Sequence, residues 1–230
     1  MKDLKEFAKN VYSQNGEDGI IEEILRRLNI ENGNCCELGA WDGIKFSNTY
    51  NLVEKKDWYA IYIESDEEKY KELLITAEQY INKNPPPTKF FDGMKPYREN
   101  YIYAINAKVT DNLDIALIMG RMLPDFDILS IDVDGEDYYI WEHVGTKERL
   151  FYPKIVIIEV NSSVPPPIEQ THDSEHQGSS FTSMLKLGNE KGYDLVCHTG
   201  NMIFVRKDLT GDLFENMNSD SLFTDKWVAK

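Results

Sequence analysis

Residues 35–49 read CCELGAWDGIKFSNT, and this stretch decides the fold class. An apolar run closes at Leu38, and glycines follow it at positions 39 and 43. Glycine lets a backbone turn sharply and approach a ligand without a Cβ in the way. The spacing differs from GxGxxG and contains no GK[ST] phosphate loop. The stretch therefore predicts a buried strand followed by a turn beside a ligand, with a strand-to-helix turn that merely requires glycine as the alternative.

The two cysteines that open this stretch predict buried strand positions rather than a metal site. Cys35 and Cys36 are adjacent, which is poor chelating geometry compared with CxxC. Successive strand residues face opposite sides of a sheet, so we expect one small apolar side chain on each face. With Cys197 the chain has three cysteines, an odd number that gives no disulfide framework. This usage predicts a reducing, cytoplasmic compartment.

Strand-like and helix-like segments alternate along the rest of the chain. Apolar spacing and end signals predict helices at 17–28, 47–56, 66–81, 113–122, 136–144 and 179–193. Apolar runs predict strands at 34–39, 58–65, 101–109, 126–135 and 154–161, with a closing hairpin at 194–207. This alternation predicts an α/β fold: a mostly parallel sheet with helices on both faces and antiparallel strands at one edge.

Length and composition predict one domain. The chain has 230 residues, of which 41% are hydrophobic and 28% charged, which suits a single globular domain spanning 1–230. Within it we expect an N-terminal helical segment at 1–30. Proline runs predict lid-like loops near 84–101 and 162–180, because proline cannot continue a helix.

The net charge of −15 limits the classes of binding partner to be expected. Nucleic acids and anionic membranes require a basic face, so neither is expected as a main partner. No apolar run approaches the ~20 residues that span a bilayer, and the N-terminus lacks the apolar core of a signal peptide. These observations leave small-molecule substrates open.

Acidic residues stand where the first two predicted strands end. Ligands of mostly parallel sheets bind at the carboxyl ends of the strands. Glu37 lies at the end of the first strand, and Glu64 follows the second, 21 residues beyond Gly43. An acid at that distance suits two hydrogen bonds to a ribose diol. The alternative for Glu64 is a helix-capping acid beside Ser65 and Asp66.

The fourth predicted strand ends in four acids within six residues, at positions 132, 134, 136 and 137. Such acids repel one another, so a nearby cation, either a metal or a cationic substrate, would explain them. The alternative is a loop in which Asp134 and Gly135 form a turn while the other acids, such as Glu136 and Asp137, cap a helix. Asp132 is the stronger candidate for a site, because it lies inside an otherwise apolar strand.

The fifth predicted strand supplies further oxygen ligands at the same edge. Glu159 ends its apolar run and should lie near Asp132 on a neighbouring strand, and Asn161 follows two residues later. Together these side chains would make an oxygen-rich site suited to a hard divalent ion. Two neighbouring carboxylates could instead share a proton.

The two predicted loops carry the remaining candidates. His172 and His176 lie in the loop at 162–180, which we expect to form a lid over the site. The pair lacks the helical HExxH context, so no zinc site is predicted, and His172 is equally well explained as a surface residue. In the other loop, Tyr97, Arg98 and Tyr101 are candidate substrate contacts, with an ordinary surface loop as the alternative.

Several stretches together resemble a known family. They are YSQNGEDGIIEEIL (12–25), ELGAWDGIKFSNTYNL (37–52), DFDILSIDVDGEDYYIW (125–141), PKIVIIEVNSS (153–163) and the tail at 178–208. In combination they look like the FkbM-type branch of the class I S-adenosylmethionine-dependent methyltransferases. The resemblance covers about residues 12–208. It implies a Rossmann-like sheet of seven strands with the last strand antiparallel.

The same resemblance implies S-adenosylmethionine as the cofactor and methyl transfer to a hydroxyl of a sugar, glycan precursor or natural product. It also implies a set of residues at the cofactor pocket: Gln14, Asp18, Glu37, Gly39, Ala40, Asp42, Gly43, Ser47, Asn48, Glu64, Ser65, Asn106, Ala107 and Asp132. Some related sugar O-methyltransferases use a divalent metal, for which Asp132, Asp134, Glu159 and Asn161 are the candidates here.

Methyl transfer to a hydroxyl requires alignment of donor and acceptor and removal of a proton. Asp132 or His176 is the hypothesised base, with Glu159 supporting a metal or the substrate. One alternative is N-methylation of a small amine or amino-sugar derivative, which needs no base if the amine arrives neutral. A catalytically silent S-adenosylmethionine-binding module is another. A nicotinamide-dependent oxidoreductase is disfavoured because GxGxxG is missing.

Overall fold

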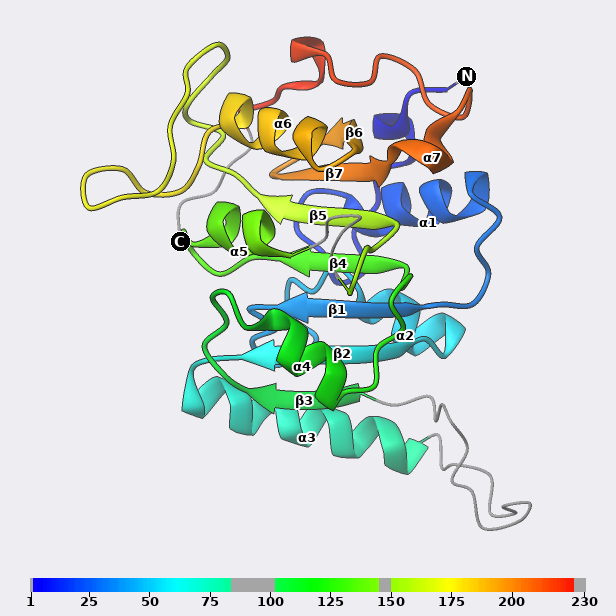
Figure 1. Ribbon diagram of the computed structural model, residues 1–230. Coiled ribbons are helices and arrows are strands. Elements are labelled where there is room, and N and C mark those ends of the chain that lie inside the picture. Colours follow the sequence, from blue (N-terminus) through cyan, green and yellow to red (C-terminus); the bar gives the residue numbers. More distant parts are fainter. Residues whose placement is uncertain (1, 84–101, 145–149, 226–230) are drawn as a thin grey trace.

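A computed structural model of the chain describes residues 2–83, 102–144 and 150–225 (Figure 1). The predicted loop near 84–101, with its candidate contacts Tyr97, Arg98 and Tyr101, lies outside these ranges. None of the helices within them is both long and apolar enough to cross a lipid bilayer.

The centre of the molecule is a sheet of seven strands in the order β3-β2-β1-β4-β5-β7-β6. The strands are β1 (Asn34–Leu38), β2 (Tyr59–Glu64), β3 (Ile102–Asn106), β4 (Ile128–Ile131), β5 (Ile155–Glu159), β6 (Tyr193–His198) and β7 (Asn201–Arg206). Pairing is parallel throughout, except that β7 runs antiparallel to both β5 and β6. The predicted α/β class and Rossmann-like sheet are confirmed. The hairpin contributes one antiparallel strand because β7 inserts between β5 and β6.

Helices cover both faces of this sheet. They are α1 (Glu17–Arg27), α2 (Tyr50–Lys56), α3 (Glu67–Lys83), α4 (Leu113–Met119), α5 (Asp137–His143), α6 (Phe181–Glu190) and the short α7 (Lys207–Thr210). One core packs beneath α4, α5 and α6, which lie in front of the sheet in Figure 1. The other packs beneath α1, α2 and α3. The segment predicted as helical at 1–30 contains a 3-10 turn at Leu4–Phe7 and then α1.

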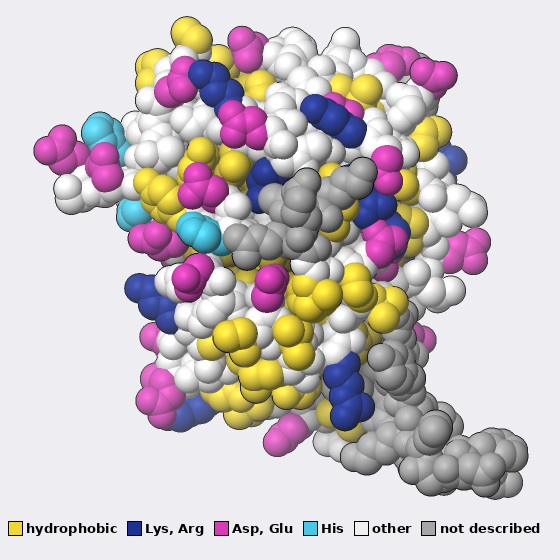
Figure 2. All heavy atoms as spheres, in the orientation of Figure 1, with side chains coloured by type: hydrophobic (Ala, Val, Ile, Leu, Met, Phe, Trp, Pro, Cys, Tyr) yellow, Lys and Arg dark blue, Asp and Glu magenta, His cyan; other side chains and the backbone are white. Residues whose placement is uncertain are grey.

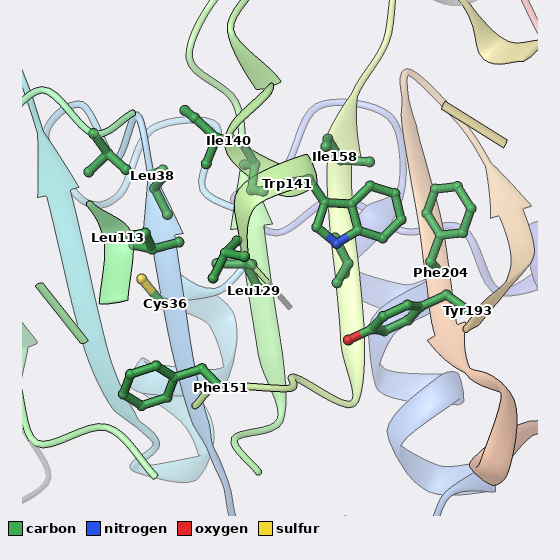
Figure 3. Packing of buried hydrophobic residues seen from close by; sticks show 14 of the residues in the cluster. Cys36, Leu38, Leu113, Leu129, Ile140, Trp141, Phe151, Ile158, Tyr193 and Phe204 are labelled. Carbon is green, nitrogen blue, oxygen red and sulfur yellow. The ribbon is translucent and has the colours of Figure 1, made fainter. Parts of the chain in front are cut away.

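The cysteines of β1 divide between the two cores, as predicted. Cys36 belongs to the core beneath α4, α5 and α6, and Cys35 to the opposite one. Figure 3 shows Cys36 and Leu38 on the same side of the sheet as Leu129 and Trp141. Strand alternation therefore turns the intervening Glu37 toward the α1, α2 and α3 face. This orientation decides which residues meet its carboxylate.

Candidate functional site

A cavity of about 310 Å³ opens at the carboxyl ends of β1, β2 and β4. Six of the residues proposed from the sequence line it: Gly39, Glu64, Ser65, Ala107, Asp132 and Asp134. Nine further lining residues were not proposed as site residues: Leu38, Trp41, Ile63, Asp66, Lys69, Lys108, Val109, Val133 and Glu136. Parallel strands bring their ends to one edge of a sheet, and this is where α/β proteins bind their ligands.

The turn after β1 needs glycine at position 39. Its φ is 73°, and a Cβ there would lie 1.8 Å from the carbonyl oxygen of Asp132 at the end of β4. The N–H groups of Gly39 and Ala40 donate to the carbonyl of Ile63 at 3.0 and 3.1 Å, so the turn is tied to β2 as well. Position 39 thus lets three strand ends converge on the cavity.

The rest of the turn is closed by local hydrogen bonds. Gly43 has a φ of 80° and donates to the carbonyl of Ala40 at 2.7 Å. The Asp42 carboxylate accepts the N–H groups of Ile44 and Lys45 at 2.9 and 2.7 Å. Asp42 and Gly43 therefore shape the turn without lining the cavity.

Glu64 joins this turn to the start of α3. One carboxylate oxygen accepts the N–H of Trp41 at 2.9 Å, and the other accepts the N–H of Asp66 at 2.7 Å. The Glu64 carboxylate thus lies at the start of α3 and lines the cavity, and its binding to a ribose diol stays a prediction. Because a carboxylate oxygen can accept two hydrogen bonds, a ligand's hydroxyls still find acceptor positions there.

The end of β3 is fixed to the same place. The Asn106 amide donates to the carbonyls of Glu64 and Ser65 at 2.9 and 3.4 Å. The N–H of Ala107 also donates to the Glu64 carbonyl, at 3.2 Å. Asn106 thus connects β3 with β2, while Ser65 and Ala107 line the cavity.

Glu37 lies beneath the cavity rather than in its wall. Its carboxylate accepts hydrogen bonds from the Ser47 and Thr49 hydroxyls and from the N–H of Asn48. The Asn48 amide donates in turn to the Ser130 hydroxyl at 3.1 Å. Burial raises the pKa of Glu37 to about 7 despite these donors. The residues from Ser47 to Thr49 surround this acid, and α2 consequently begins at Tyr50 instead of at residue 47.

The N-terminal candidates are likewise absent from the lining of this cavity. One Asp18 oxygen accepts the N–H groups of Val11, Tyr12 and Ser13, each at 2.8 Å, and the Ser13 hydroxyl at 2.7 Å. The carbonyl of Gln14 accepts the Asn10 amide at 2.8 Å. These contacts organise the segment that leads into α1.

Three of the four proposed metal ligands come together. Asp132, Asp134 and Glu159 offer carboxylate oxygens that all lie within 4.8 Å of one another. The Asn161 side chain is engaged elsewhere: its amide donates to the carbonyl of Gln177 at 2.8 Å, and its oxygen accepts from Ser163. Asn161 thus anchors the loop after β5.

Asp137 holds the loop that carries Asp132 and Asp134. Its two oxygens accept the N–H groups of Val133 and Gly135, both at 2.9 Å. Burial first and the nearby Asp132 second raise the pKa of Asp137 to about 7. Asp137 begins α5, so the sequence-based alternative of a helix-terminal acid describes its position.

The two loop histidines occupy different surroundings. His176 is exposed, and its Nδ1 lies 2.9 Å from Asp173 in the same turn. His172 accepts the N–H of Gly178 at 3.1 Å. Its ring packs on the loop after β4, where a Cβ at Gly135 would lie 2.6 Å from it. His172, not His176, therefore contacts the loop that lines the cavity.

The charge of the cavity wall is predominantly negative. Five lining residues are acids (Glu64, Asp66, Asp132, Asp134 and Glu136) and two are lysines (Lys69 and Lys108). Acidic side chains are also spread over the molecular face drawn in Figure 2. A predominantly negative wall favours a ligand with positive charge.

Comparisons with known proteins give structural likeness only. No family model matches the sequence, and no curated protein matches it. Among solved structures, M. capricolum TrmK in complex with S-adenosyl-homocysteine is 11% identical, with a TM-score of 0.45 over 80% of this chain and 66% of that one. A putative sarcosine dimethylglycine methyltransferase from Galdieria sulphuraria is 13% identical, with a TM-score of 0.45 over 76% of this chain and 60% of that one.

A third structure has nearly the same extent as this chain. The precorrin-6y C5,15-methyltransferase from Geobacter metallireducens GS-15 is 13% identical, with a TM-score of 0.46 over 89% of this chain and 95% of that one. In contrast, this chain spans only 66% and 60% of the first two structures. At such identities the likeness is one of fold alone.

Proposed function

We propose that this protein is an S-adenosylmethionine-dependent methyltransferase that acts on a hydroxyl of a small molecule, such as a sugar, a glycan precursor or a natural product. One observation carries the proposal: the glycine turn after β1, the acid after β2 and Asp132 after β4 meet in a single cavity. The negative wall of this cavity suits a cofactor whose sulfonium and amino groups are cationic.

The residues present fit such a cofactor. Gly39 lines the cavity and carries no side chain, so its backbone can approach the amino acid part. Glu64 would offer acceptors to the ribose hydroxyls, and Ser65 and Ala107 would hold the adenine. When bound, the cofactor supplies an activated methyl group on its sulfonium, beside Asp132.

The other candidates act in this proposal through the residues that line the cavity. Glu37, held by Ser47 and Asn48, supports the end of β1. Asn106 fixes the ends of β2 and β3. Ala40, Asp42 and Gly43 shape the turn, and Gln14 and Asp18 order the segment before α1.

Asp132 is the base that we propose for a hydroxyl acceptor. It lines the cavity, and a general base must come within hydrogen-bond reach of the proton that it removes. His176, the other base hypothesised from the sequence, lies in an exposed turn. It would reach an acceptor only if the loop after β5 moved.

A divalent ion such as Mg²⁺ also fits this site. Ligand oxygens lie about 2.0–2.1 Å from Mg²⁺, so carboxylate oxygens within 4.8 Å of one another would need only small side-chain shifts to hold the ion. Asp132, Asp134 and Glu159 would hold the ion, which lowers the pKa of a bound hydroxyl. Asn161 would join them only by giving up its bonds to Ser163. Glu159→Gln should weaken Mg²⁺ binding about tenfold in calorimetry, and unchanged binding would remove Glu159 from the site.

The acceptor is a small molecule in this proposal, because a charge of −15 opposes nucleic acid. The three cysteines are unpaired, which fits the cytoplasmic location inferred from the sequence.

Calorimetric titration with S-adenosylhomocysteine and, separately, with NADH tests the proposal. We expect micromolar binding of the first and none of the second. Preference for NADH, or no binding of either, would overturn it. Methyl transfer to a panel of sugars and amines then distinguishes the alternatives. Transfer to amines that survives Asp132→Asn would indicate an N-methyltransferase. Cofactor binding without transfer to any acceptor would indicate a catalytically silent binding module.

A further inference from the structure

The backbone of Trp41 is held in an unfavourable conformation at the cavity. Its φ of 49° is left-handed, a region that bulky residues rarely adopt. The hydrogen bond from its N–H to Glu64 fixes this conformation at 2.9 Å. Such backbone strain is often retained where it aims a side chain at a ligand. Here the aimed side chain is a half-buried indole that lines the cavity.

Two lysine side chains also contact the indole ring. The ammonium groups of Lys45 and Lys69 lie over the ring, 4.9 and 4.8 Å from its centroid. Lys69 is fixed in turn, since its Nζ lies 3.1 Å from a Glu72 oxygen and its N–H donates to Asp66 at 2.9 Å. Cation–π contacts of this length stabilise a ring position. Trp41 is therefore a fixed wall residue of the cavity.

We propose that Trp41 determines the affinity for the nucleoside half of the cofactor, an inference that rests on the proposed function. Its indole provides an apolar surface, and its backbone N–H donates to Glu64, the proposed acceptor for a sugar diol. A flat apolar wall beside a diol acceptor matches a ribose that carries a purine. In this proposal Glu64 accepts hydrogen bonds from the ribose hydroxyls, and Trp41 contacts the purine ring.

Phe46 provides a matched control in the same turn. It also has a left-handed backbone, with a φ of 62°, and it also lies near Lys45, 4.9 Å from ring centroid to Nζ. Its side chain is 43% exposed and does not line the cavity. Removal of either aromatic ring therefore disturbs similar local contacts, but only Trp41 would contact the ligand.

The test is calorimetric titration with S-adenosylhomocysteine and with adenosine. Trp41→Ala should raise both dissociation constants about tenfold, Trp41→Phe should raise them less than about threefold, and Phe46→Ala should leave them unchanged. Wild-type affinity in Trp41→Ala, or equal losses in Trp41→Ala and Phe46→Ala, would overturn the inference. Absence of binding to the wild-type protein would instead overturn the proposed function.

Fluorescence gives a second measurement if Trp41→Ala does not fold. Of the described tryptophans, Trp58 and Trp141 are only 1% and 0% exposed, whereas Trp41 lines the cavity. In a Trp227→Phe background, which removes the tryptophan outside the described ranges, S-adenosylhomocysteine should change the emission. Adding Trp41→Phe should abolish that change. Unchanged emission while calorimetry records binding would contradict the inference.

Discussion

Glu23 and Glu37 are buried to similar extents in opposite electrostatic surroundings. Glu23, on α1, is 6% exposed and receives the guanidinium groups of Arg26 and Arg27 at 2.7 and 2.8 Å. These hydrogen bonds lower the pKa of Glu23 to about 2. Glu37, beneath the cavity, is 4% exposed and receives only neutral hydroxyl and amide donors from the described residues. Burial raises its pKa to about 7.

The difference is between an acid paired with cations on a helix and an acid held by neutral donors beneath the cavity. Acid near the helix surface is neutralised by its own chain. Asp137 repeats the pattern of Glu37, because burial raises its pKa to about 7. Raised carboxyl pKa values of this kind cluster at functional sites. Substitutions in the two regions should consequently separate activity from stability.

The largest contrast is expected between Asp132→Asn and Glu23→Gln. Asp132→Asn should lower methyl transfer at least about 100-fold, because the base is lost, while the thermal midpoint changes little. Glu23→Gln should lower the midpoint and spare the rate. Initial rates with labelled cofactor and thermal melts measure both. Near-normal turnover by Asp132→Asn would remove that residue from the mechanism.

Next in size is the effect of Gly39→Ala. The new Cβ would meet a backbone oxygen at 1.8 Å, and the φ of 73° disfavours alanine. We expect a loss of about 3 kcal/mol in the free energy of unfolding. Gly211→Ala is the control, because its φ is 43° but nothing lies within 4 Å, and it should cost only about 1 kcal/mol. Denaturant melts compare the two, and equal losses would show that the close approach to β4 is unimportant.

The third prediction concerns pH. Folded Glu37 keeps its proton up to about pH 7, whereas its ordinary pKa is 4.5. The folded state therefore binds more protons than the unfolded state between these values, and stability falls as pH rises through them. Glu37→Gln should remove on the order of 2 kcal/mol of that fall. Part of the fall in stability should remain in this variant, because the pKa of Asp137 is also raised to about 7. Denaturant melts from pH 4.5 to 8 measure it, and an unchanged slope would contradict the raised pKa.

The smallest effect is expected from Glu23→Gln, with the opposite pH dependence. The lowered pKa of Glu23 gives stability above pH 4.5 that is lost as pH falls toward 2. Because the Arg26 side chain is 71% exposed, the substitution should cost only about 1 kcal/mol at neutral pH. Denaturant melts should show a lower free energy of unfolding for the variant than for the wild type at pH 7. This difference should become smaller at pH 3.

The sequence predicted the sheet because its signals are local. Apolar runs and helical spacing mark each element, and adjacent positions such as Cys35 and Cys36 must face opposite sides of a strand. The acids at the strand ends also follow from local order, and Glu64 and Asp132 do line the cavity. Patterns carried by neighbouring residues were therefore sufficient for the architecture.

The side chains that complete the cavity depend on contacts between distant residues. The left-handed turn at Trp41 is held by Glu64, 23 residues away. The contact of His172 with Gly135 depends on the path of the loop after β5. Glu37 satisfies the sequence pattern of a cofactor acid, yet strand alternation turns its carboxylate into the opposite core. The one available signal for Trp41 was its position between the two glycines of the turn.

The buried cysteines give the protein a set of internal reporters of unfolding. Burial raises the thiol pKa of Cys35, Cys36 and Cys197, so alkylating reagents should modify them only when the structure opens. Cys35 and Cys36 probe the two faces of the central strand β1, and Cys197 probes the edge strand β6. Mass spectrometry of alkylated protein can then resolve the order of opening. Earlier modification of Cys197 would reveal an edge that opens before the sheet, and simultaneous modification a single cooperative unit.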